Sequence, residues 1–196
     1  TSNISFNEWK SQFIEHAVSN NVSKELLVEI FNSINKPNSK VIKLYNKQPE
    51  KLLTFSQYLK RTISNSRINK GKKLQIKHEK ILSRVSKKYN VQSRFIIAIW
   101  GIETNYGEYT GGFNVISALS TLAYDSKRKK YFKKELLNAF KILDKNHIKA
   151  ENMKGSWAGA MGQTQFMPSS FLVYAVDENK DNVINIWDTE EDVFAS

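Results

Sequence analysis

The sequence predicts a mainly α-helical fold. Three observations support this: apolar residues recur at helical spacing along most of the chain, strand signals are thin, and no repeat or low-complexity segment interrupts the pattern. With 196 residues, 40% of them hydrophobic, the chain is long enough for one core with an appended lobe. The longest apolar run, Phe95 to Ile102, is far shorter than the roughly 18 residues that a membrane span needs. We therefore expect a soluble globular protein without a transmembrane segment.

The N-terminal part is expected to contain three helices. The first has apolar residues at helical spacing, namely Phe6, Trp9, Phe13 and Ala17. Residues 26–34 repeat this spacing after a candidate cap at Ser23. Lys40 to Glu50 contains Pro49 and is expected to be extended or irregular, and a helix resumes over residues 54–63.

A long helix is expected after Gly71, because a stripe of apolar residues follows it at helical spacing: Leu74, Ile81, Leu82, Val85 and Tyr89. His78 lies on the same side, where a lone histidine is more often packed than a ligand. Similar spacing predicts two more helices, one around residues 115–122 and one around residues 132–143.

The stretch 93–107, SRFIIAIWGIETNYG, is the strongest candidate for a catalytic site. Four side chains are predicted to share one helical face: Ile96, Ile99, Trp100 and Glu103. A carboxylate removed from water without a partner raises its pKa and keeps its proton, as a general acid must near neutral pH. Residues 105–107 supply a helix stop beside it. The alternative is a surface glutamate on a helix whose buried face has another phase.

The charge is strongly positive and uneven. Lysine and arginine outnumber aspartate and glutamate 30 to 19, which gives a net charge of +11. Between Lys60 and Asn90 eleven basic residues face a single acid, Glu79. Such a stripe favours polyanions, but a solvated helix face is the simpler interpretation, because aromatic residues are not interleaved as in a nucleic-acid platform. Cysteine is absent, which excludes disulfides, thiol nucleophiles and cysteine metal sites.

Residues 155–168, GSWAGAMGQTQFMP, break the helical pattern. Small residues let backbones approach closely or bring a ligand near the main chain. A tightly packed helix pair is the alternative, although a mere packing contact has little use for two glutamines.

The second break, residues 177–188, reads DENKDNVINIWD and has the layout of an EF-hand calcium loop. The expected ligands are oxygens at loop positions 1, 3, 5, 7 and 12, from Asp177, Asn179, Asp181, the Val183 carbonyl and Asp188. Asn182 replaces the usual glycine at position 6, which is tolerable because asparagine accepts positive φ. Aspartate at position 12 is shorter than the usual glutamate, so affinity is expected to be weak. A plain acidic turn is the alternative.

Four ordered blocks resemble the lytic murein transglycosylase B family, the soluble or lipid-anchored enzymes that cleave bacterial peptidoglycan. The blocks are IWGIETNYG, SALSTLAYD, GSWAGAMGQTQFMPSSF and YAVDENKDNVINIWD, and the similarity extends upstream through LYNKQPE and the region of Tyr58. The resemblance implies a lysozyme-like helical core with additional N-terminal helices and an EF-hand-like metal loop. We expect residues 1–90 to form an N-terminal helical lobe and residues 91–196 the core, shortened at its C-terminus relative to the family.

The resemblance also implies roles for individual residues. Glu103 matches the family's single catalytic acid, Ser156, Gln165 and Tyr58 match residues lining the glycan cleft, and Arg128 lies where the family contacts the peptide stem. The family's metal loop also carries aspartate at position 12, which supports Asp188 as a ligand. The implied cofactor is a structural calcium ion, with sodium as an alternative and no organic cofactor.

The implied function is non-hydrolytic cleavage of the bond between N-acetylmuramic acid and N-acetylglucosamine, with formation of a 1,6-anhydro product. The expected partners are glycan strands and peptide stems, not nucleic acid, and the expected state is a monomer. The implied location is the periplasm or outer membrane of a Gram-negative bacterium, with an export signal outside this chain. The alternatives are a catalytically impaired peptidoglycan-binding module and a lysozyme-like hydrolase.

Overall fold

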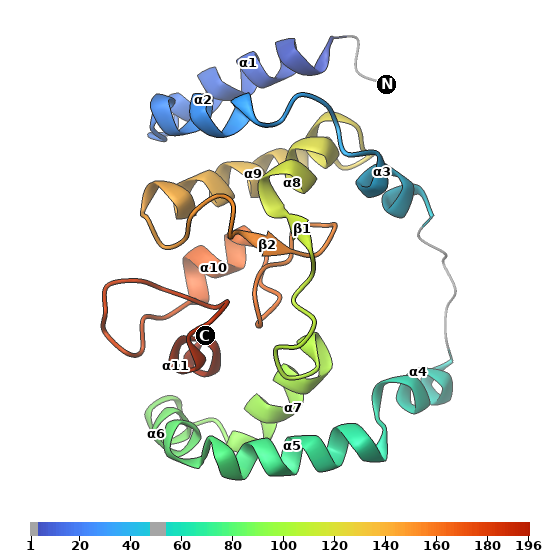
Figure 1. Ribbon diagram of the computed structural model, residues 1–196, viewed down its shortest axis with the longest axis vertical. Coiled ribbons are helices and arrows are strands. Elements are labelled where there is room, and N and C mark those ends of the chain that lie inside the picture. The colour runs from blue at the N-terminus through green and yellow to red at the C-terminus, as the bar shows by residue number, and fades with distance from the viewer. Residues whose placement is uncertain (1–3, 48–53) are drawn as a thin grey trace. The chain divides into compact units, whose positions relative to one another are not determined.

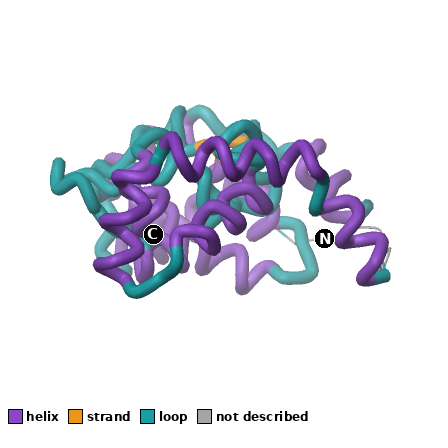
Figure 2. The backbone as a smooth tube through the Cα atoms, turned by 90° about the horizontal axis from the view of Figure 1, so that it is seen from below, coloured by secondary structure: helices purple, strands orange, loops and turns teal. Residues whose placement is uncertain are grey.

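The structure is a computed structural model that describes residues 4–47 and 54–196, and helices dominate the described chain (Figure 1 and Figure 2). The elements are, in order, α1 (Phe6–Val18), α2 (Lys24–Asn32), α3 (Ser39–Asn46), α4 (Phe55–Thr62), α5 (Asn65–Lys77), α6 (Glu79–Tyr89), α7 (Ser93–Thr104), β1 (Phe113–Asn114), α8 (Val115–Tyr124), α9 (Lys129–Asp144), β2 (Lys154–Gly155), α10 (Pro168–Tyr174) and α11 (Glu190–Ala195). The predicted mainly α-helical fold is confirmed. No helix in the described ranges is long and apolar enough to cross a membrane.

The chain divides into two compact units, each made of separate segments. The first unit comprises Thr1–Gln48, Gly111–Met161 and Phe166–Tyr174. The second comprises Pro49–Thr110, Gly162–Gln165 and Ala175–Ser196. These units cut across the boundary expected between residues 90 and 91, because α7 packs against α5 and α6.

The first unit is built around α8 and α9, which pack along each other. Helix α8 is buried along nearly its whole length, from Val115 to Ala123 except for Ser117. Three phenylalanines from α1, α2 and α9 form an aromatic cluster whose ring centroids lie 5.3 to 5.9 Å apart: Phe13, Phe31 and Phe140. Such apolar burial is the main stabilising contribution to this unit.

The strands β1 and β2 also belong to the first unit. They pair antiparallel, with Phe113 opposite Gly155 and Asn114 opposite Lys154. A Cβ at Gly111 would lie 2.1 Å from the Gly155 carbonyl oxygen, and Gly111 has a φ of +94°. Glycine is therefore required at the entrance to this short ribbon.

The core of the second unit joins α6 and α7 to the C-terminal helix α11. Its buried apolar residues are Leu82, Val85, Ile97, Trp100, Val193 and Phe194. His78 is 5% exposed and its ring lies 5.7 Å from Trp100 and 5.5 Å from Phe194, which confirms the expectation that this histidine is packed.

Two predicted segments differ from the structure. Residues 39–46 form α3 instead of irregular chain, because the Asn38 side chain caps the helix by accepting from the Lys40 and Val41 amides. Only Val41 of this helix is buried, so apolar spacing gave no signal. Residues 48–50 of the predicted irregular segment, with Pro49, lie outside the described residues.

The long helix expected after Gly71 is in fact two helices that meet at His78. Gly71 lies in the middle of α5, where an added Cβ would stand 2.5 Å from the Tyr106 hydroxyl oxygen. The glycine therefore allows a close helix contact and does not mark a helix start. On these helices Lys72, Lys73 and Lys77 are exposed, as a solvated face requires.

Candidate active site

Helix α7 carries Glu103, but its buried face is not the predicted one. The buried residues are Ile97, Trp100, Gly101 and Thr104, one position out of phase with the expected stripe. Ile99 is 60% exposed, and Glu103 is exposed as well. The predicted burial of Glu103 is therefore wrong, because the helix turns its Ile97 and Trp100 side inward and its Glu103 side outward.

The end of α7 agrees with the predicted stop. Asn105 and Tyr106 both have positive φ, 52° and 64°, and Asn105 is the left-handed C-cap. The Tyr106 hydroxyl donates to the Arg67 carbonyl at 2.8 Å, and its ring fills the space beside Gly101, where a Cβ would lie 2.6 Å from the ring. Burial raises the pKa of Tyr106. This packing fixes the last turn of the helix, which presents Glu103.

A glutamine that the sequence did not single out holds α7 in place. Gln163 Oε1 accepts from Trp100 Nε1 at 2.8 Å, while Gln163 Nε2 donates to the Trp187 carbonyl at 2.7 Å. Thr104 Oγ1 donates to the Gln163 carbonyl at 3.1 Å. The sequence showed only that two glutamines lie among small residues. That pattern does not distinguish the glutamine that holds the fold from one that could bind a ligand.

Gln165 lies in the same unit as Glu103. Its φ is +51°, and its Nε2 donates to the carbonyls of Thr110 at 3.0 Å and Gly162 at 2.9 Å. The amide nitrogen is therefore committed to the fold. In the described part of the chain, Gln165 Oε1 accepts no hydrogen bond, so this oxygen is free to accept from a ligand.

Tyr58 is 49% exposed on α4, also in the second unit. The end of α4, α5 and α7 line an apolar groove of about 300 Å³ that includes Ile63, Ile68 and Ile102. Ile102 directly precedes Glu103 in the sequence, and Glu103 itself is not among the residues that line this groove.

The remaining predicted contact residues lie in the first unit. Ser156 Oγ accepts from the amides of Ala158 at 3.3 Å and Ala160 at 3.0 Å, so this hydroxyl shapes its own turn. Arg128 is exposed, and its guanidinium stands 4.2 Å from the Tyr131 ring centroid. This stacking orients the guanidinium and leaves N–H donors for a carboxylate.

The predicted metal loop curls around its own acidic side chains. Asp177 accepts from the amides of Asp181 at 3.2 Å and Asn182 at 2.9 Å, and Asp181 accepts from the Val183 amide at 2.8 Å. Asn182 has a φ of 71°, as expected for the residue at position 6. The curvature and the oxygen donors suit a hard cation.

The loop is held from two sides by residues that the sequence did not indicate. Asp192 on α11 is fully buried and accepts from the amides of Glu178 and Asn185, both at 2.8 Å. Burial raises the pKa of Asp192. The hydrogen bonds from these amides oppose that shift.

On the other side, the Glu178 carboxylate accepts from Lys88 at 2.7 Å and from the Tyr89 hydroxyl at 3.1 Å. The hydrogen bond from Lys88 holds the pKa of Glu178 below its ordinary value.

The loop does not gather all its predicted ligands. Within residues 4–47 and 54–196, no three His, Cys, Asp or Glu side chains come together as a metal-binding group. Asp177, Asp181 and Asp188 are therefore not assembled around one point. Asp188 is exposed and has no bond to the other two.

Comparison with known proteins gives consistent matches along the chain. Residues 5–196 match the transglycosylase SLT domain family. The membrane-bound lytic murein transglycosylase B of Escherichia coli (strain K12) is 37% identical over 133 residues, which are 67% of this chain and 37% of that protein.

Solved structures match almost the whole chain. SltB3 from Pseudomonas aeruginosa in complex with NAG-NAM-pentapeptide is 36% identical, with a TM-score of 0.94 over 97% of this chain and 51% of that chain. The same protein in complex with NAG-anhNAM-pentapeptide gives a TM-score of 0.93. The Escherichia coli lytic transglycosylase Slt35 in complex with calcium is 33% identical, with a TM-score of 0.83 over 95% of this chain and 59% of that chain. The chain thus spans roughly half the length of these solved relatives.

Proposed function

Since the chain belongs to the transglycosylase SLT domain family, among the relatives of lytic murein transglycosylase B, we propose that it cleaves peptidoglycan as a lytic transglycosylase. The observation that carries the proposal is the match of residues 5–196 to this family, with Glu103 at the end of α7 in the block IWGIETNYG. The complexes of SltB3 with NAG-NAM-pentapeptide and NAG-anhNAM-pentapeptide support a muramyl substrate and an anhydro product.

Glu103 is proposed to act first as the acid and then as the base. Most glycosidases use two carboxylates, one of them as base or nucleophile. In the proposed reaction Glu103 gives its proton to the glycosidic oxygen, and the bond from the muramic acid C1 to that oxygen breaks with its electron pair on the oxygen. The carboxylate then takes the proton of the sugar's own 6-hydroxyl as that oxygen bonds to C1. The 1,6-anhydro ring forms and no water is consumed.

Because Glu103 is exposed, its own helix does not shield it from water during the reaction. We propose that the bound glycan itself covers Glu103, because the helix does not bury this side chain. The apolar surface beside Ile102 offers a face for the sugar rings.

The remaining assignments follow from what each side chain can still bind. Gln165 Oε1 and the Tyr58 hydroxyl suit sugar hydroxyl and acetamido groups, and the Arg128 guanidinium suits a carboxylate of the peptide stem. Ser156 is proposed to line the glycan site as well. Its hydroxyl hydrogen remains available as a donor, since the oxygen accepts from two amides.

The decisive experiment is a digest of purified sacculi with mass spectrometry of the products. We expect anhydro-muropeptides from the parent chain, a rate at least about 100-fold lower for Glu103→Gln, and a nearly unchanged rate for the control Glu108→Gln. Reducing-end products would instead identify a hydrolase. Binding to sacculi without release of soluble products would identify an impaired binding module.

We also propose that the loop at residues 177–188 binds calcium, with sodium as an alternative. The ligands would be the side-chain oxygens of Asp177, Asn179, Asp181 and Asp188 and the Val183 carbonyl. The curled loop, the positive φ of Asn182 and the calcium complex of Slt35 support this. Binding would draw Asp188 toward the first three ligands and stabilise the loop.

Thermal unfolding tests the calcium proposal. Calcium at about 100 times its dissociation constant adds about 2.7 kcal/mol of stability, or roughly 5–11 °C in Tm for a chain of this size. Asp177→Ala should abolish the shift, whereas Asp144→Ala, which changes an aspartate outside the loop, should keep it. An unchanged Tm of the parent at saturating calcium would refute the site.

The proposed setting is the bacterial envelope, in the periplasm or at the outer membrane, where peptidoglycan lies. The proposed partners are glycan strands and their peptide stems, without nucleic acid or organic cofactor, and the proposed state is a monomer. Size measurement in solution and binding to sacculi test the last two points.

A further inference from the structure

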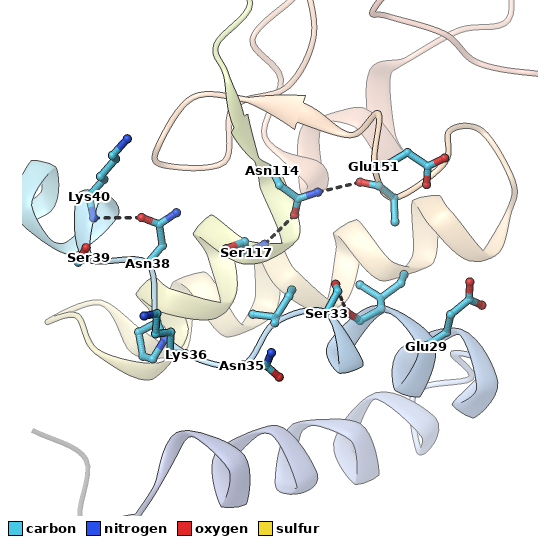
Figure 3. Close-up of a pocket in the computed structure, with 14 residues that line it drawn as sticks. Glu29, Ser33, Asn35, Lys36, Asn38, Ser39, Lys40, Asn114, Ser117 and Glu151 are labelled. Carbon is cyan, nitrogen blue, oxygen red and sulfur yellow. Dashed lines mark hydrogen bonds between the residues drawn. The ribbon is translucent and has the colours of Figure 1, made fainter.

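The first unit contains a groove of about 1010 Å³ to which none of the proposed roles refers (Figure 3). It is lined by the end of α2, the connection to α3, the start of α8 and residues 150–151. Ile30, Ile34 and Pro37 contribute apolar surface to it. The groove is large enough for several amino-acid residues.

Several polar groups of the groove already serve the fold. Asn114 donates to the Ala150 carbonyl at 2.8 Å and accepts from the Ser117 amide at 2.9 Å. The Asn38 side-chain oxygen accepts from the Lys40 amide at 3.0 Å. These bonds fix the walls of the groove, so its shape exists before any ligand binds.

The charged side chains of the groove are different, because none of them makes an ion pair or a side-chain hydrogen bond within the described residues. Lys36 and Lys40 lie at one end and Glu29 and Glu151 at the other, as Figure 3 shows. All four are exposed. None of them forms an ion pair with another residue of the described ranges, so the two positive and two negative groups remain available.

We propose that this groove binds a short peptide that carries both a carboxylate and an ammonium group, namely a stem peptide that is not cross-linked. The lysines at one end take the carboxylate by charge-assisted hydrogen bonds, and the glutamates at the other end take the ammonium. A neutral sugar chain matches neither end, and a polyanion is repelled by Glu29 and Glu151.

The position of the groove fits a peptide attached to a glycan. Helix α3 begins at the groove, and near its other end the Tyr45 hydroxyl accepts from the Lys127 amide at 3.1 Å. Arg128, the proposed contact for the stem peptide, follows directly. Eight helical residues span about 12 Å, which is within the reach of a few extended residues. This inference rests on the proposed function, since that function supplies the peptide.

Calorimetric titration of the Glu103→Gln chain tests the proposal with three synthetic tetrapeptides. One peptide carries a free C-terminal carboxylate and a free side-chain amine. The second is amidated at the carboxylate, and the third is acetylated at the amine. We expect each modification to weaken binding about tenfold, corresponding to about 1.4 kcal/mol. Equal binding of all three peptides, or no binding, overturns the proposal with no variant of the groove needed.

Variants of the groove then locate the site. Lys36→Ala combined with Lys40→Ala should weaken binding of the free peptide about tenfold and remove the preference for the free carboxylate only. Glu29→Gln combined with Glu151→Gln should remove the preference for the free amine only.

Lys43→Ala on α3 and Glu15→Gln on α1 serve as controls, because both residues are exposed and lie outside the groove. Loss of binding in these controls equal to that in the groove variants refutes the location. The result is independent of the sacculus digest, which reports on Glu103, so failure of one proposal is distinguishable from failure of the other.

Discussion

Replacing Gln163 by alanine is expected to loosen the helix that carries Glu103. In the parent chain Gln163 accepts from the Trp100 indole at 2.8 Å and donates to the Trp187 carbonyl at 2.7 Å. Both tryptophans are buried, with 7% and 8% of their surface exposed. Alanine leaves one N–H and one carbonyl oxygen without these partners.

The cost follows from these two bonds. Leaving a buried polar group unsatisfied costs about 1–3 kcal/mol, and two such groups would cost about 2–6 kcal/mol. Releasing the ordered Gln163 side chain returns up to about 2 kcal/mol of conformational entropy. From the middle of the cost range, about 4 kcal/mol, this return leaves a net loss of about 2–4 kcal/mol, or roughly 4–16 °C in Tm for a chain of this length.

Thermal and denaturant unfolding measure this loss. Gln92→Ala is the matched control, because Gln92 is exposed and makes no side-chain cap bond at the start of the same helix. It should change the free energy of unfolding by less than about 0.5 kcal/mol. Activity on sacculi should fall more for Gln163→Ala than its unfolded fraction explains, since Trp100 lies one turn before Glu103.

The variant Gln163→Glu sharpens the test. An ionised carboxylate can still accept from the Trp100 indole, but it places a second acceptor against the Trp187 carbonyl. Protonation restores a donor, so the deficit of this variant relative to the parent should shrink as pH falls. If Gln163→Ala and Gln92→Ala have equal Tm and equal activity, Gln163 does not hold α7 in place.

Two further predictions concern Asp192 and Glu178, whose hydrogen bonds hold the loop at residues 177–188. Asp192→Ala should cost about 2–4 kcal/mol, because the buried Glu178 amide and the partly buried Asn185 amide lose their acceptor. Asp144→Ala should be near neutral by the same unfolding assay. The pKa of Glu178 is lowered from 4.5 in the folded chain, so its stabilisation is complete above pH 4.5 and lost as pH falls through the folded pKa. Glu178→Gln should therefore narrow the gap in Tm between neutral and acidic pH, and an unchanged gap would contradict the assignment.

Some helices with buried apolar residues were predictable from sequence, but burial is not the whole explanation. Helix α4 was predicted although none of its residues is buried, whereas α11, which buries Val193 and Phe194, was not predicted. Helix α1 buries Phe6, Phe13 and Ala17, so its spacing was visible. Helix α3 buries only Val41 and depends on its Asn38 cap, which periodicity does not report. The break between α5 and α6 was missed for a related reason, because apolar spacing continues through His78 while the backbone turns.

The candidate site was predicted in part. The position of Glu103 on a helix that stops at Asn105 is confirmed. The predicted burial of Glu103 is wrong. The prediction failed because nearly every residue from Phe95 to Ile102 is apolar. Such a run gives no contrast between the two faces, and Ile97 occupies the inner face while Ile99 is exposed. The tertiary contacts of Tyr106 and Gln163 select the phase, and both are long-range contacts that spacing does not encode.

The glutamines of residues 162–165 show how structure limits what a polar motif can do for a ligand. From sequence alone, a packing contact is expected to have little use for amides, yet Gln163 uses both ends of its amide in packing. Gln165 uses its nitrogen on the Thr110 and Gly162 carbonyls. Only Gln165 Oε1 remains available, and an oxygen can only accept. A glycan bound there must therefore present a hydroxyl or an acetamido N–H, and a carboxylate of the substrate must be recognised elsewhere.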